Sequence, residues 1–216
     1  MKNLNAIFKN FKGVDGALIT SEPGTFYLSG YINDAAFILL TKDSALYFTD
    51  SRYTEEATAA CCDLAEVVTV KSSNVFSTIA EYVRKFNIKT LGFEGKYVSF
   101  NTYSAMANAF DGVKLVPVDN ALDEARMVKT REELSLIKKA AAINDKAFTR
   151  MLKKVKAGVT EKQLSSELEY QMRKLGADGL AFTTIVAFGA NTSKPHAHAG
   201  DTHLKEGMPV TIDFGC

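Results

Sequence analysis

The residues best suited to chemistry lie close together near the end of the 216-residue chain. All three histidines, His196, His198 and His203, fall in one polar stretch, and Asp213 follows in a short apolar run. An imidazole exchanges protons near neutral pH, and a carboxylate can ligate a divalent cation. A carboxylate within an apolar strand is costly unless something pairs with it. The pattern therefore indicates a hydrolytic site that combines a proton carrier with a metal ligand.

Asp213 belongs to a strand that we predict over residues 209–214. Side chains alternate between the two faces of a strand, so Val210 and Ile212 point one way. Thr211 and Asp213 then share the other face, and we expect their side chains to line a polar cavity or to face a cation. The plainer alternative is a solvated aspartate at a strand end, which needs no partner.

The histidines follow a turn-rich loop that starts at Phe188. His196 comes directly after Pro195, and a neutral imidazole there could donate to a scissile carbonyl or accept a proton. A histidine that merely decorates the surface is the competing interpretation. His198 fits the rim of a substrate pocket, or is simply exposed. A zinc cluster of His196, His198 and His203 is not favoured, because the first two need not converge on one ion.

Two helices and two strands must position these residues. Thr130 with Glu133, and Thr160 with Gln163, fit the capping box that starts a helix. Apolar residues recur behind both boxes at helical spacing. They are Leu134, Ile137, Ala141, Phe148, Met151, Leu152 and Val155 in the first helix, and Leu164, Leu168, Met172 and Leu175 in the second. With strands at 182–188 and 209–214, the segment reads as an ααββ unit of the α+β class.

Residues 1–122 are organised differently. Strands alternate with helices there, which predicts an α/β domain. The predicted helices cover 3–12, 75–86 and 100–110, with another opening at Asp50, and the predicted strands cover 17–20, 25–28, 36–40, 45–48, 66–70, 90–93 and 113–116. The pattern changes near residue 122, so we place a domain boundary there and assign residues 123–216 to the second domain.

Composition argues against several classes of protein. The chain is 46% hydrophobic and 24% charged, as in ordinary globular proteins. A net charge of +1 gives no reason to expect nucleic acid or an anionic membrane as a partner. No apolar run approaches the length of a membrane span. Three cysteines without a Cys-x-x-Cys spacing do not form a disulfide framework, so we expect a reduced, cytoplasmic setting.

The chain resembles the creatinase/prolidase/methionine-aminopeptidase family. The most specific motif is G-x-N-x-S-x-P-H, from Gly189 to His196, followed by L-x-x-G-x-x-V-x-x-D-F-G, from Leu204 to Gly215. Weaker motifs of the family match FYLSGY at 26–31, TDSRY at 49–53 and RMVKTREEL at 126–134. Four motifs in this order cover nearly the whole chain and match the two-domain layout of prolidase and Xaa-Pro aminopeptidase.

This resemblance implies a creatinase-type N-terminal domain, a mixed sheet with helices, over residues 1–122. Residues 123–216 would be the first half of a pita-bread metallopeptidase domain. The implied enzyme is a Xaa-Pro aminopeptidase or dipeptidase, a homodimer that hydrolyses the bond before proline in short peptides through hydroxide held by two divalent metals (Mn, Co or Zn). Asp213 matches the first metal ligand, and His196 matches a catalytic, substrate-contacting histidine.

In the family, a second aspartate, a ligand histidine and two ligand glutamates would follow Cys216. We therefore expect the 216-residue chain by itself to be inactive, with metal binding weak or absent. The alternative is a non-catalytic assembly module derived from the same family. Arg52 and Tyr53 could reach the substrate of a neighbouring subunit, or could cap and pack the start of a helix.

Overall fold

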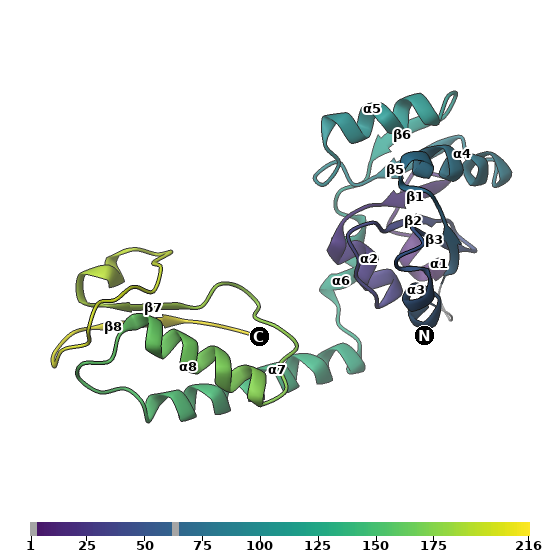
Figure 1. The fold of residues 1–216 in the computed structure, drawn as a ribbon. Helices are drawn as coiled ribbons and strands as arrows, with labels where there is room; N and C mark the ends of the chain where they lie inside the picture. Colours follow the sequence, from purple (N-terminus) through teal and green to yellow (C-terminus); the bar gives the residue numbers. More distant parts are fainter. Residues whose placement is uncertain (1–3, 62–64) are drawn as a thin grey trace. The chain divides into compact units, whose positions relative to one another are not determined.

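The computed structural model describes residues 4–61 and 65–216. They form two compact units, Met1–Val128 and Lys129–Cys216, each with its own core (Figure 1). The first residue of the helix predicted at 3–12 lies outside the described residues. Within the described residues the helix is shorter than predicted, because α1 spans Leu4–Phe8.

A six-stranded mixed sheet forms the centre of the first unit, in the order β4-β3-β2-β1-β5-β6. Its strands are β1 Gly16–Ile19, β2 Phe37–Leu40, β3 Ala45–Thr49, β4 Glu66–Thr69, β5 Thr90–Phe93 and β6 Lys114–Pro117. β2 pairs antiparallel with β1 and β3, and the strands predicted at 36–40 and 45–48 form a hairpin. The pairs β1–β5, β5–β6 and β3–β4 are parallel. The predicted α/β class of this unit is confirmed.

Helices cover both faces of this sheet. One core cluster takes residues from α1, α2 Glu22–Ser29, α3 Thr54–Cys61 and α6 Ala121–Met127. The other takes residues from α4 Val75–Lys85, which follows the short 3₁₀ helix η1 Ser72–Asn74, and from α5 Phe100–Ala109. Successive strand residues enter different clusters: Ile38 and Leu40 enter the first and Leu39 the second. Burial on both faces explains why these strands are continuous apolar runs.

The strand predicted at 25–28 is wrong, because residues 22–29 form the helix α2. Ser21 caps it: its hydroxyl accepts from the Gly24 N–H at 3.1 Å. Gly30 ends the helix in the left-handed conformation, with φ of 75°, and its N–H donates to a main-chain carbonyl of the last turn. The cap at Ser21 and the left-handed Gly30 favour a helix more strongly than the β-propensity of the residues between them favours a strand.

The start of α3 is also later than predicted. The helix begins at Thr54, while Asp50 holds the turn before it by accepting from the Arg52 N–H at 2.9 Å. The Arg52 guanidinium donates to the same carboxylate at 2.7 Å and lies over the ring of Tyr53, 5.0 Å from its centroid. These contacts fit the second of the two predicted roles of Arg52 and Tyr53, in which they cap and pack the start of a helix.

In the second unit, α7 Arg131–Leu152 and α8 Glu161–Lys174 pack with the antiparallel strands β7 Ile185–Phe188 and β8 Val210–Asp213. Both predicted capping boxes are confirmed. The hydroxyls of Thr130 and Thr160 accept from main-chain N–H groups in the first turn, and the Glu133 and Gln163 side chains accept in return. The predicted ααββ order is confirmed as well.

Only the second half of α7 enters the core of this unit. Ile143, Ala147 and Met151 are buried, whereas Leu134 and Ile137 of the predicted inward stripe are 44% and 51% exposed. Leu152 and Ala141 of the same stripe are exposed too. The reason is length: α7 has 22 residues and α8 has 14, so the first turns of α7 extend past the helix that packs against it. Within the described residues, no long helix is apolar enough to cross a membrane.

The first unit extends through Val128, whereas the sequence placed the boundary near residue 122. Helix α6 belongs to this unit because Ala121 and Leu122 are buried in its core. The Tyr27 hydroxyl also donates to the Ala125 carbonyl at 3.2 Å. Together these contacts attach α6 to the first unit.

Candidate functional site

Asp213 occupies the last position of β8. Its neighbours Ile212 and Phe214 pack against the core of the second unit, and the Phe214 ring stacks on Phe148 with centroids 5.7 Å apart. Because both neighbours face the helices, the Asp213 side chain must point to the other side of the strand pair. Thr211 lies on that same side, and both side chains are exposed. The predicted shared face of Thr211 and Asp213 is therefore confirmed.

His196 and His198 lie in the loop that follows the 3₁₀ helix η2, Gly189–Ser193. Both are exposed, whereas Ala197 between them is only 4% exposed. Ala197 thus anchors the loop to the unit and leaves both imidazoles accessible to a ligand. His203 lies further along and forms an isolated β-bridge with Thr160, just before α8.

In residues 4–61 and 65–216, no group of three or more His, Cys, Asp or Glu side chains is placed to hold a metal ion. The histidines therefore do not assemble into a zinc cluster in this part of the chain. A divalent cation takes four or more ligands, and one carboxylate supplies at most two of them. Asp213 can contribute to a metal centre, but these residues alone do not complete one.

Glu161, the first residue of α8, is the functional candidate that the sequence did not reveal. It has no exposed surface. Its carboxylate accepts from the main-chain N–H groups of Phe188 and Gly200, each at 2.7 Å, and from the Asn191 side-chain amide at 3.1 and 3.2 Å. An acidic residue in the first turn of a helix is common because it complements the helix dipole. The pattern alone therefore gives no sign that this one is buried.

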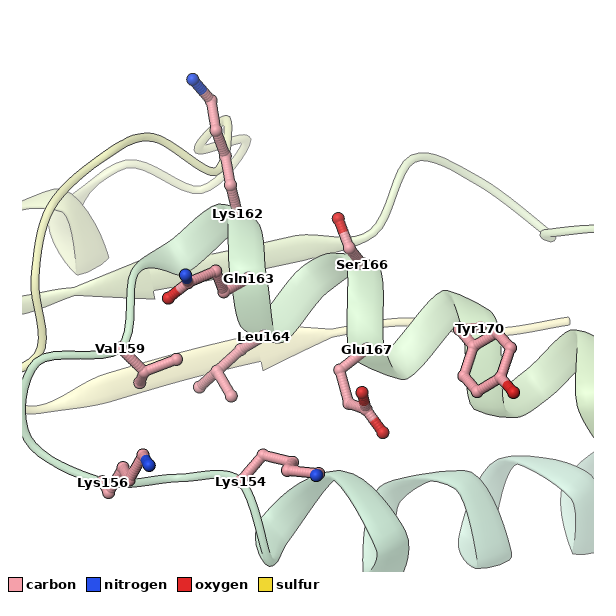
Figure 2. A pocket seen from close by; sticks show the side chains of 9 residues that line it. All are labelled: Lys154, Lys156, Val159, Lys162, Gln163, Leu164, Ser166, Glu167 and Tyr170. Carbon is pink, nitrogen blue, oxygen red and sulfur yellow. The ribbon is translucent and has the colours of Figure 1, made fainter.

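A surface hollow of about 510 Å³ lies on another part of the second unit, between α8 and the end of α7 (Figure 2). Three lysines line it, with Glu167 and Tyr170 among its other residues. In Figure 2, Glu167 points toward α7, whereas Lys162 points away from it. The hollow does not include His196, His198 or Asp213, so it is separate from the predicted site.

Comparison with known proteins bears on both units. The family described as creatinase/prolidase N-terminal domain matches residues 1–128, and metallopeptidase family M24 matches residues 135–216. The chain belongs to the creatinase/prolidase family. Membership of an M24 metallopeptidase family implies that divalent metal is used. The predicted fold class is confirmed: the chain comprises the N-terminal domain of the creatinase/prolidase family and part of its pita-bread catalytic domain.

Individual relatives agree with this assignment. The Bacillus subtilis (strain 168) protein named uncharacterized peptidase YqhT is 36% identical over 203 residues, which is 94% of this chain and 57% of YqhT. The Xaa-Pro dipeptidase of Pyrococcus horikoshii is 30% identical over 213 residues, 96% of this chain and 57% of that protein. The solved Xaa-Pro dipeptidase from Bacillus anthracis matches with a TM-score of 0.92 and 33% identity, covering 99% of this chain and 60% of that one. The chain thus spans less than two thirds of each of these creatinase/prolidase relatives.

Proposed function

We propose that this chain supplies the N-terminal domain and the first part of the catalytic domain of a metal-dependent Xaa-Pro peptidase. The reaction is hydrolysis of the peptide bond before proline in short peptides. The observation that carries the proposal is the match of both units, over 99% of the chain, to the Bacillus anthracis Xaa-Pro dipeptidase. Assembly as a homodimer and a cytoplasmic setting belong to the same proposal.

Each predicted site residue has a proposed role. Asp213 is a metal ligand, which its exposed position on the face opposite the helices supports. His196 hydrogen-bonds the substrate carbonyl or carries a proton, and its exposed imidazole is open to a substrate. His198, exposed beside it, contacts the substrate at the rim of the pocket.

The metal requirement belongs to the whole protein and not to the described residues alone. Divalent cations bound in such a centre, Mn, Co or Zn, lower the pKa of water and so supply a nucleophile. Asp213 by itself cannot fill the coordination sphere of one ion, and the described residues offer no group of three ligands. We therefore expect no measurable hydrolysis of Xaa-Pro peptides by the 216-residue chain alone.

The test compares two variants in the complete product of the gene. Asp213→Asn is expected to lower the bound metal, measured by mass spectrometry, together with turnover. His196→Ala is expected to keep the metal but to lower turnover about 10²–10⁴-fold, the usual effect of removing a positioned proton-transfer group. His203→Ala, a histidine in a β-bridge, serves as the matched control. Normal turnover of a Xaa-Pro dipeptide by His196→Ala would contradict the role proposed for His196.

A second candidate function is a non-catalytic assembly module derived from the family. Such a module would need no metal centre, and the described residues hold no group of three metal ligands. The same assay separates the two candidates, because an assembly module would show no Xaa-Pro hydrolysis in the complete gene product either.

A further inference from the structure

The buried carboxylate of Glu161 binds three consecutive parts of the second unit: the end of β7, the 3₁₀ helix η2 and the loop that carries the histidines. One donor, the Phe188 N–H, is at the end of β7, and the Asn191 amide is on η2. The third, the Gly200 N–H, lies in the loop that carries the histidines. A side chain at position 200 would meet the Glu161 carboxylate at 3.3 Å, so a glycine there lets the main chain come close.

The chemistry of this contact requires a carboxylate. Burying a charged group is costly unless hydrogen bonds replace its hydration, and here three N–H donors do so beside the N-terminus of α8. A carboxylate accepts with both oxygens, whereas a glutamine side chain offers one acceptor and one donor. In Glu161→Gln the amide nitrogen would therefore face an N–H group, and at least one of the three segments would be released.

The two partners Asn191 and Gly200 of the Glu161 carboxylate flank the stretch that carries His196 and His198, whereas His203 lies beyond it. Gly200 follows His198 by two residues, and the Asn191 amide that binds Glu161 also donates to the His198 carbonyl at 3.4 Å. His203 is held differently, by its β-bridge to Thr160 and by main-chain bonds of the next residue. The Glu161 side chain thus holds Asn191 and Gly200 on either side of the two histidines, while main-chain bonds to residues 158–162 hold the loop from Gly200 to Leu204.

We propose that Glu161 is the positioning residue for His196 and His198: it fixes the loop that presents both imidazoles. Its carboxylate is buried beneath the loop, so it acts through the two histidines and touches no reacting atom. The inference rests on the proposed function for the roles of His196 and His198, but the arrangement of the loop itself does not depend on catalysis.

The experiment uses the 216-residue chain with isotope-labelled histidine and the variant Glu161→Gln. The readouts are the imidazole NMR signals of the three histidines, amide hydrogen exchange, and unfolding by urea. We expect the His196 and His198 imidazole signals to shift and the backbone order parameters of both residues to fall from about 0.85 to below about 0.6, while His203 is unchanged. Exchange at the Phe188 and Gly200 amides should accelerate about tenfold or more, the effect of losing a hydrogen bond to a charged group.

The matched control is Glu206→Gln, the same chemical change at an exposed position before β8, which should alter none of the three signals. A second variant, Asn191→Ala, leaves the buried carboxylate in place and covers the case in which Glu161→Gln fails to fold. It should move the His198 signal and leave His203 unchanged.

Two results would overturn the proposal. One is that His196 and His198 keep their signals while the Phe188 and Gly200 amides exchange faster. The other is that all three histidines change together in Asn191→Ala. Because no readout is peptidase activity, failure here leaves the test of the proposed function untouched, and the reverse also holds.

Discussion

At the scale of single residues, both units use a buried glutamate to hold backbone N–H groups. Glu161 does so beneath the histidine loop. In the first unit Glu94, 5% exposed, accepts from the main-chain N–H groups of Thr20 at 2.7 Å and Ser21 at 2.9 Å, and from the Ser21 hydroxyl at 2.7 Å. Glu94 follows β5 and these donors follow β1, so one carboxylate ties together the ends of two parallel neighbours. Donors that would otherwise be buried without a partner are thereby satisfied.

Replacing Glu94 with glutamine should destabilise the first unit. The amide offers a single acceptor oxygen, so one buried donor of Thr20 or Ser21 would face another donor. Leaving such a group unsatisfied costs about 1–3 kcal/mol. We expect the free energy of unfolding of Glu94→Gln, measured in urea, to fall by this amount. Glu81→Gln, at an exposed position on α4, is the control, and equal midpoints for the two variants would show that Glu94 contributes nothing.

At the scale of elements, residues at the ends of a segment decide its conformation as much as those inside it. The segment of α2 contains aromatic and branched residues that favour strands, yet it is helical between Ser21 and Gly30. Its buried residues are two adjacent pairs four positions apart, Gly24 with Thr25 and Leu28 with Ser29, which lie on one face of a helix. The left-handed conformation of Gly30 lets the chain leave that helix toward β2.

The variant Gly30→Ala tests this account of α2. An alanine at φ of 75° carries a backbone cost of roughly 1 kcal/mol, and nothing lies within 4 Å of the added Cβ, so no clash contributes. We expect a lower melting temperature, followed by circular dichroism. Gly30→Asn should lose less, because asparagine tolerates the left-handed region better than alanine does. Equal losses in both variants would mean that the conformation of Gly30 is not what matters.

At the scale of the whole molecule, the chain consists of two units with separate cores. The first has a six-stranded sheet covered on both faces, which is enough for a domain of common size. The second combines two helices with two strands, and its β8 carries Asp213 on the face away from the helices. The connection between the units follows α6, whose residues pack with the first.

Residues 1–128 should therefore fold by themselves, and the exact end of the fragment should matter. A fragment that stops at residue 122 loses the bond between the Tyr27 hydroxyl and the Ala125 carbonyl and the packing of Ala125. We expect it to be about 1–2 kcal/mol less stable than residues 1–128 in chemical denaturation, the contribution of one hydrogen bond and a small apolar contact. A non-cooperative transition for residues 1–128 would show that the first unit is not an independent domain.

The sequence by itself determined what depends on near neighbours and on regular spacing. Both capping boxes involve residues three apart, and the shared face of Thr211 and Asp213 follows from the period of a strand. The order of motifs identified the family, and the roles of His196, His198 and Asp213 stay predictions that rest on those motifs.

The tertiary structure decided what depends on distant contacts. Glu161 meets Phe188 and Gly200, which are 27 and 39 residues away in the chain, and no local pattern records such a meeting. The exposure of Leu134 follows from the length of a different helix, α8, and the assignment of α6 to the first unit follows from Tyr27, 98 residues before Ala125. Burial is a property of the folded chain as a whole, so an acidic side chain that would ordinarily face solvent in the first turn of a helix can become the buried attachment of a loop.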